Sequence, residues 1–154
     1  MTDTMPHTMK RSDIVKGAAI SGAINAVVNG AIQAFLLRGE GPVPLSVDAI
    51  SAGTPTVLGE AVPLAVSLAM ILSAVAYWTL KAPKKPFVPT ALWLIVKHGL
   101  FAFGAVVSAA VVWQRAMGTV EVSVGAAVLV LGVLAGLVAA VVNYLTVSAV
   151  IDDA

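Results

Sequence analysis

Four long apolar tracts, separated by shorter polar segments, dominate the chain. They cover residues 17–37, 58–80, 90–113 and 122–150. A helix needs about 20 mainly apolar residues, at about 1.5 Å per residue, to span the hydrocarbon core of a bilayer. Each tract meets this length. The pattern therefore predicts an all-α integral membrane bundle of four transmembrane helices, built as a single domain over 17–150.

The composition agrees with a membrane location. Hydrophobic residues make up 59% of the 154 positions, and charged residues 11%, against about 25% charged in a typical soluble domain. The chain has no cysteine, which excludes disulfides, thiolate metal sites and cysteine nucleophiles. The net charge of +1 gives no indication of a nucleic-acid partner. We expect an integral protein of a bacterial inner (cytoplasmic) membrane, with the lipid bilayer as its surroundings.

The distribution of Lys and Arg predicts the orientation. Three precede the first tract and three lie in the loop after the second, whereas the other two loops hold only Arg38 and Arg115. Cytoplasmic segments carry the excess of positive charge, so both termini are expected in the cytoplasm. Segment 1–16 is expected to be a disordered, basic tail, in which Ser12 or Asp13 could cap an earlier helix start.

The sequence leaves two points of organisation open: the arrangement of the outer loop and the start of the third helix. The outer loop, 38–57, contains three prolines, which rule out a continuous helix. It is also too apolar for a freely solvated loop, so we expect it to lie over the mouth of the bundle. A faint match between 16–23 and 97–105 would make the chain two tandem helical hairpins. It would also allow the third helix to begin near residue 97, after an interfacial segment 87–96.

A polar stripe lies next to a ridge of small residues in the first tract. Residues four apart share one face of a helix, small residues admit a neighbouring backbone, and amides can hydrogen-bond across such a contact. This face is expected to point toward protein or water. The stripe consists of Ser21, Asn25, Asn29 and Gln33, and the glycines expected in close helix packing are Gly22, Gly30, Gly104, Gly132 and Gly136.

Depth along the predicted helices groups several polar residues. Four side chains from three helices, about 10–12 Å from the cytoplasmic ends, are expected to form one layer: Asn25, Lys97, His98 and Asn143. Asn29 would lie near the midplane, and Gln33 and Glu60 near the outer surface. Ionisable groups inside a membrane are costly and indicate function by default. An ammonium among amides would suit a polar or anionic solute.

Each of these residues also has a structural alternative. The amides could serve only to hold helices together. Lys97 could snorkel toward the cytoplasmic surface, and His98 could be a packed, hydrogen-bonded core residue. Glu60 could be a carboxylate that suits the N-terminal dipole of the second helix.

The function favoured by these patterns is a small transport or channel module for a polar or anionic solute, working as an oligomer. The alternative is a non-enzymatic accessory or scaffold subunit of a larger membrane complex. An enzyme is not expected, because nucleophilic catalysis needs an activated side chain and no serine lies in a recognisable motif. No catalytic residue, metal site or cofactor is predicted.

Overall fold

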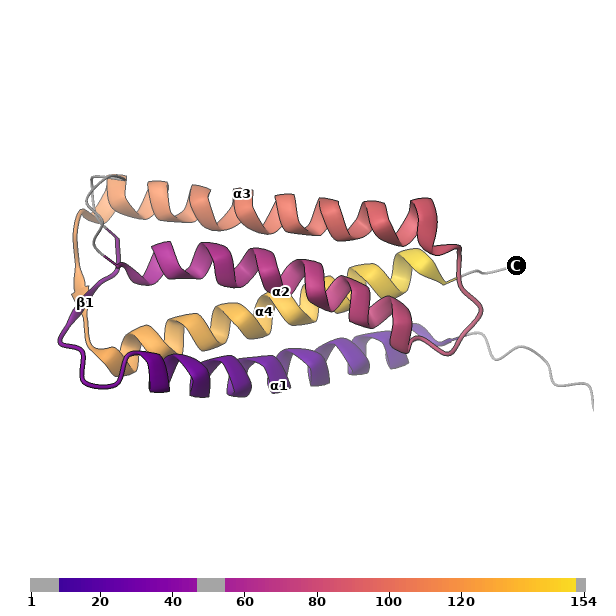
Figure 1. Cartoon of the computed structure of the whole chain (residues 1–154), viewed down its shortest axis with the longest axis horizontal. Coiled ribbons are helices and arrows are strands. Elements are labelled where there is room, and N and C mark those ends of the chain that lie inside the picture. The colour runs from indigo at the N-terminus through magenta and orange to yellow at the C-terminus, as the bar shows by residue number, and fades with distance from the viewer. Residues whose placement is uncertain (1–8, 47–54, 152–154) are drawn as a thin grey trace, which may run out of the picture.

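The computed structural model describes residues 9–46 and 55–151. Four of its helices are long and apolar enough to cross a membrane, which confirms the all-α transmembrane bundle. They run along the long axis of the molecule (Figure 1). The helices are α1 (Arg11–Leu36), α2 (Val57–Thr79), α3 (Leu92–Met117) and α4 (Val124–Val150).

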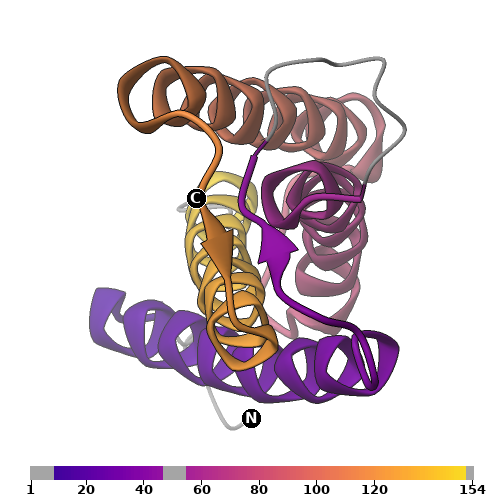
Figure 2. The ribbon, with the colours of Figure 1, turned by 90° about the vertical axis from the view of Figure 1, so that its left-hand side faces the viewer.

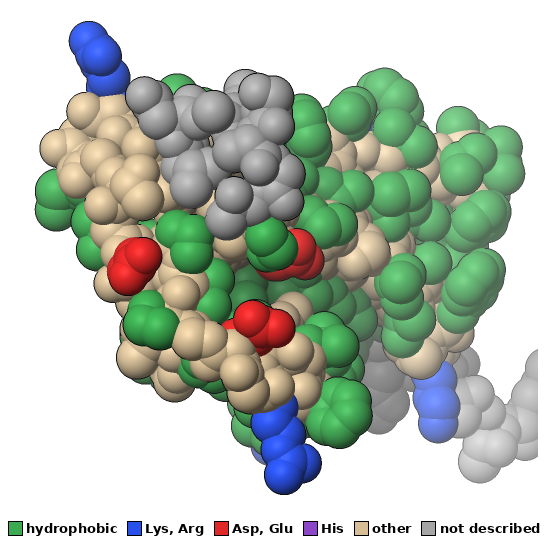
Figure 3. Space-filling model, turned by 60° about the vertical axis from the view of Figure 1, so that its left-hand side comes forward, with side chains coloured by type: hydrophobic (Ala, Val, Ile, Leu, Met, Phe, Trp, Pro, Cys, Tyr) green, Lys and Arg blue, Asp and Glu red, His purple; other side chains and the backbone are tan. Residues whose placement is uncertain are grey.

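The two ends of the described chain lie at the same end of the bundle (Figure 1). We call this the inner end; it holds Lys10, Lys81 and Ile151. The opposite, outer end holds Gly41 and Gly118. Hydrophobic side chains cover much of the flank between the two ends, and charged side chains lie toward the ends (Figure 3). Val27 and Phe101, for example, are 73% and 71% exposed, as expected of side chains that face lipid.

Helix α1 begins earlier than the first apolar tract. It starts at Arg11, so 11–16 is helical rather than disordered, while 1–8 lie outside the described residues. Neither Ser12 nor Asp13 caps the helix. Lys10 occupies the N-cap position and its side chain makes no capping hydrogen bond. Charged residues mark the edge of a membrane span, but they do not end a helix.

Helix α3 also begins before the later of the two predicted starts. A short segment, η1 (Phe87–Ala91), in which the backbone of Val88 is not helical, leads into α3 at Leu92. The alternative start near Lys97 is therefore wrong. Ala91 and Leu94 are buried and pack in a cluster with Tyr77 and Val147, so this segment belongs to the bundle rather than lying apart from it as an interfacial segment.

The helices pack in the order α1, α4, α2, α3. Helix α4 lies between α1 and α2, and α3 packs mainly against α2 (Figure 2). Two tandem hairpins related by a two-fold axis would give this order. However, the residues matched in the sequence differ in environment, because Gly22 is buried against α4, whereas a Cβ at Gly104 would meet nothing within 4 Å. The match therefore does not support a duplication.

The centre of the bundle is packed with small apolar residues. Ala61, Ala65 and Ala69 of α2 are fully buried, and they share a core cluster with Ala127 and Leu131 of α4. Alanine on both faces lets two helices approach closely. These buried residues form the packed core of the described chain.

The outer end is covered by the long loop and the α3–α4 connection. The strands β1 (Val43–Pro44) and β2 (Glu121–Val122) pair antiparallel, and Leu45 N–H donates to Val120 O at 2.8 Å. Leu45 is buried in the core cluster beside Val57. The described part of the loop thus lies over the mouth of the bundle, as expected; residues 47–54 lie outside the described residues.

Two lysines anchor the α2–α3 loop at the inner end. Lys84 Nζ donates to Tyr77 O at 2.7 Å and to Leu80 O at 3.1 Å, at the C-terminus of α2. Lys85 Nζ donates to Ala149 O at 3.2 Å, at the C-terminus of α4. Ammonium groups are favourable at helix C-termini because the last carbonyls there carry partial negative charge.

Candidate functional site

The contact between α1 and α4 is made at backbone level. A Cβ built at Gly136 would lie 2.8 Å from Ala26 Cβ and 2.9 Å from Gly22 O. A Cβ at Gly132 would lie 3.4 Å from Gly30 Cα. Four of the five glycines expected in close packing therefore meet in one contact. The fifth, Gly104, is exposed on α3.

The hydrogen bonds of Asn25 and Asn29 stay within α1 and do not reach another helix. Asn25 Nδ2 donates to Ser21 O at 2.9 Å, and Asn29 Nδ2 donates to Asn25 O at 3.0 Å. The amide nitrogens of Asn25 and Asn29 thus both donate to backbone carbonyls of α1, as short polar side chains in helices often do. Asn29 is buried, and Asn25 and Gln33 are half-buried. These two hydrogen bonds therefore do not connect α1 to α4.

The predicted layer of four polar residues is not assembled. Lys97 is exposed on α3, whereas His98 is buried against α2 and α4. Consecutive residues of a helix point about 100° apart, so the two cannot share a face. Asn25 lies on α1, which makes no substantial contact with α3. Depth was a poor guide because it says nothing about the direction of a side chain around its helix.

Glu60 is separate from these residues. It is exposed in the first turn of α2, where a carboxylate suits the helix dipole. The N-cap residue of this helix is Thr56, whose hydroxyl accepts from Gly59 N–H at 2.9 Å. The structural alternative thus accounts for the position of Glu60.

His98 joins three helices in a buried polar junction. Its Nδ1 lies 2.8 Å from Ser73 Oγ of α2 and 3.4 Å from Thr146 Oγ1 of α4. Ser73 and Thr146 are fully buried, and His98 is 8% exposed. His98 was a predicted site residue, but its partners Ser73 and Thr146 were not predicted. The available signal was that Ser73 and Thr146 are polar positions in otherwise apolar tracts.

The Ser73–His98 pair is not arranged as an activated nucleophile. Ser73 Oγ donates to Ala69 O at 2.6 Å, which uses the proton that a catalytic base would remove. The ring Nδ1–H is then assigned as the donor to Ser73 Oγ, since this tautomer satisfies the network. The pair is also buried, and with Thr146 it links α2, α3 and α4 through polar side chains.

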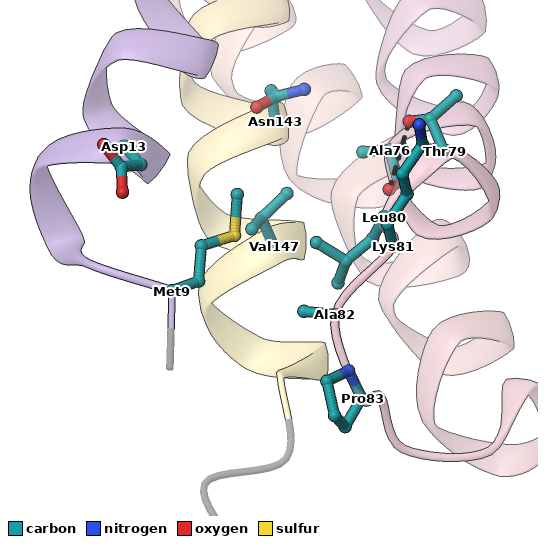
Figure 4. A pocket seen from close by; sticks show the side chains of 10 residues that line it. All are labelled: Met9, Asp13, Ala76, Thr79, Leu80, Lys81, Ala82, Pro83, Asn143 and Val147. Atoms are coloured by element: carbon teal, nitrogen blue, oxygen red, sulfur yellow. Dashed lines mark hydrogen bonds between the residues drawn. The ribbon is translucent and has the colours of Figure 1, made fainter. Parts of the chain in front are cut away.

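A pocket of about 610 Å³ opens at the inner end, between α1, α2 and α4 (Figure 4). Asn143, from the predicted polar layer, lines it from α4. The charged residues Asp13 and Lys81 also line it, and Figure 4 shows them on opposite sides. The other lining residues are Met9, Ala76, Thr79, Leu80, Ala82, Pro83 and Val147.

The pocket ends close to the polar junction. Ala76 lies one helical turn after Ser73, and Val147 follows Thr146. Neither Lys81 nor Asp13 was predicted as a site residue; Lys81 was counted only toward the orientation, and Asp13 was considered only as a helix cap. Their convergence depends on how the ends of separate helices meet, which hydropathy does not report.

Comparisons with known proteins give no indication of function, so function has to be inferred from the geometry of the structure. The chain matched no protein-family model, no characterised protein and no solved structure. Within residues 9–46 and 55–151, no three side chains of His, Asp or Glu gather as metal ligands would. The inner pocket and the junction above it are therefore the features from which function is argued.

Proposed function

We infer that the protein is a small membrane transport module for a polar solute, which it takes up at the inner end of the bundle. The observation that carries this proposal is the pocket lined by Asp13, Lys81 and Asn143. Asp13 and Lys81 are exposed at the edge of the membrane span, and together with the half-buried amide of Asn143 they bring an acid, a base and an amide to one cavity. The cavity also falls within the range of about 300–1,000 Å³ that is typical of ligand pockets.

The two ends of the bundle differ as an alternating-access mechanism requires. The inner end is hollowed by the pocket, whereas the outer end is closed by Leu45, Val57 and the paired strands. This arrangement corresponds to an inward-facing state. Passage to the outer side would require the helices to rearrange, because the alanine-rich core leaves no room for a solute.

The proposed solute is narrower than the one expected from the sequence, which was either polar or anionic. Lys97 was the reason to expect an anion, and it is exposed on α3, away from the pocket. A polar solute remains. We keep the bacterial cytoplasmic membrane, with both termini inside, as the proposed location. The reason is that four lysines lie together at the inner end: Lys10, Lys81, Lys84 and Lys85.

An accessory or scaffold subunit is the second candidate. It is favoured by the filled core and by an exposed small-residue face on α3, which contains Gly104, Ala105, Ser108 and Ala109. Such a face admits close approach of another transmembrane helix. The same face would serve assembly of an oligomeric transporter, so it does not by itself separate the two candidates.

Solute flux tests the proposal. Purified protein in liposomes would be mixed with phosphoethanolamine, phosphate, ethanolamine or glycerol, and vesicle volume followed by light scattering. We expect at least one solute to enter faster than into protein-free liposomes, and Asn143→Leu, which removes a polar group from the pocket wall, to slow it. If none of the four enters faster, transport is refuted. Co-purification with a fixed membrane partner would then favour the accessory subunit.

A further inference from the structure

We propose that the inner pocket binds a zwitterion, a molecule that carries both an ammonium and an anionic phosphate or carboxylate. The inference rests on the proposed function, because it names the chemical class of the solute for the same pocket. The observation behind it is the placement of one carboxylate and one ammonium on opposite sides of a single cavity (Figure 4).

The charges of the pocket discriminate among ligand classes. A simple anion attracted to Lys81 would share the cavity with the Asp13 carboxylate, and a simple cation attracted to Asp13 would share it with the Lys81 ammonium. Like charges that face each other across a binding site lower affinity and suppress wrong ligands. A zwitterion turned the right way meets an opposite charge on each side. The pocket therefore selects for two charges on one molecule.

The remaining lining completes such a site. Asn143 offers an amide that can both donate and accept hydrogen bonds, which suits either group of a zwitterion. Leu80 and Val147 supply apolar surface for the carbon atoms that join the two charges. The lining thus combines convergent polar groups with apolar walls, as small-molecule sites do.

Two sources could supply this chemistry. One is a free zwitterion from the aqueous phase, and the other is the head group of a zwitterionic lipid, such as phosphatidylethanolamine. The pocket lies where both reach it, since Asp13 is in the first turn of α1 and Lys81 follows the end of α2. The two sources share one recognition pattern and differ in whether an acyl chain is needed.

Binding to matched probes tests the inference. Full-length protein in phosphatidylglycerol nanodiscs would be titrated calorimetrically with phosphoethanolamine, ethanolamine and inorganic phosphate. Phosphatidylethanolamine retention would be measured by native mass spectrometry after purification from mixed lipids. We expect phosphoethanolamine to bind about tenfold or more tightly than either singly charged probe, or phosphatidylethanolamine to be retained in preference to phosphatidylglycerol. The first result identifies a free solute, and the second a lipid.

Charge variants show whether the pocket is responsible. Asp13→Asn and Lys81→Gln should each weaken zwitterion binding about three- to tenfold, and the control Lys16→Gln, exposed on α1 and not lining the pocket, should not. The double exchange Asp13→Lys with Lys81→Asp should recover part of the affinity, because the ligand can reverse its direction. Circular dichroism would check that each variant is folded.

Several outcomes would overturn the inference. These are equal binding of phosphate and phosphoethanolamine, no preference for either zwitterionic probe, or binding that is unchanged by Asp13→Asn. The flux experiment separates this failure from that of the proposed function. Entry of phosphate, ethanolamine or glycerol without phosphoethanolamine, together with no retention of phosphatidylethanolamine, would leave transport standing and reject the zwitterion.

Discussion

Replacing Gly136 by alanine should test the close contact between α1 and α4. The added Cβ would lie 2.8 Å from Ala26 Cβ and 2.9 Å from Gly22 O. Ordinary contacts of this kind are 3.4–4 Å, so the two helices would have to separate locally by about 0.6–1.2 Å. A Cβ at Gly132, one turn away, would lie 3.1 Å from Ala26 O and 3.4 Å from Gly30 Cα, so the neighbouring contact is also close and this separation would loosen it as well.

The expected magnitude combines two opposing effects. Alanine favours a helix over glycine by about 0.5–1 kcal/mol, whereas overpacking a close contact costs about 1–3 kcal/mol. Gly136→Ala should therefore lower the free energy of unfolding by up to about 2.5 kcal/mol. Gly104→Ala is the matched control, because it is also inside a helix but a Cβ there meets nothing within 4 Å. That variant should be unchanged or more stable by about 0.5–1 kcal/mol.

The measurement is unfolding in mixed micelles of dodecyl maltoside and increasing dodecyl sulfate, followed by far-ultraviolet circular dichroism. The difference between the two variants matters most, since helix propensity contributes equally to both. We expect Gly136→Ala to be less stable than Gly104→Ala by about 1–3 kcal/mol. If Gly136→Ala is as stable as Gly104→Ala, the α1–α4 contact is looser than described and the reasoning fails.

Two further predictions concern the polar junction and the orientation. His98→Leu should lower the free energy of unfolding by about 1–3 kcal/mol, because it leaves the buried hydroxyls of Ser73 and Thr146 without the imidazole. Lys97→Leu, on the exposed face of the same helix, should change it by less than about 0.5 kcal/mol, and equal effects in the same assay would contradict the junction. Single cysteines can report orientation without background, since the chain has none of its own. In intact cells an impermeant maleimide should label Gly41→Cys and leave Met9→Cys unlabelled; the reverse pattern would overturn the orientation.

The sequence was sufficient to predict the helices because their lengths and hydropathy match a bilayer. It was less informative about helix ends. Arg11 and Lys16 lie within α1 although they precede the apolar tract, because a helix can extend past the membrane edge into charged residues. The small-residue spacing was a better guide, because four of the five glycines that it marked for close packing meet in one contact, although it did not predict which helices would pair and was wrong for Gly104. Spacing reports a face directly, which explains its success.

The candidate site could be predicted only in part, and the reason is physical. In a membrane helix both the lipid-facing and the buried positions are apolar, so hydropathy does not show which face points inward. Val27 is 73% exposed and Ala18 is 6% exposed, although both are apolar residues of α1. Because the inward face of the third helix could not be recognised from hydropathy, Lys97 and His98 were grouped only by their depth in the membrane. Their separation depends on the direction in which α3 meets α2, which only the tertiary structure gives.

The packing also suggests where the proposed transport would require movement. Helices α1 and α4 meet at backbone level, so separating them would sacrifice many close contacts. Helices α2 and α3 are joined by the 2.8 Å contact between Ser73 and His98. The faces of α2 and α4 that join the two pairs are lined with alanine. The polar contact between the pairs, from Thr146 of α4 to His98 of α3, is longer, at 3.4 Å. Smooth faces allow packed helices to slide by small amounts. If the protein transports a solute as proposed, the α2–α4 seam is therefore where the bundle would open outward while each pair stays intact, and the pocket lies at the inner end of that seam.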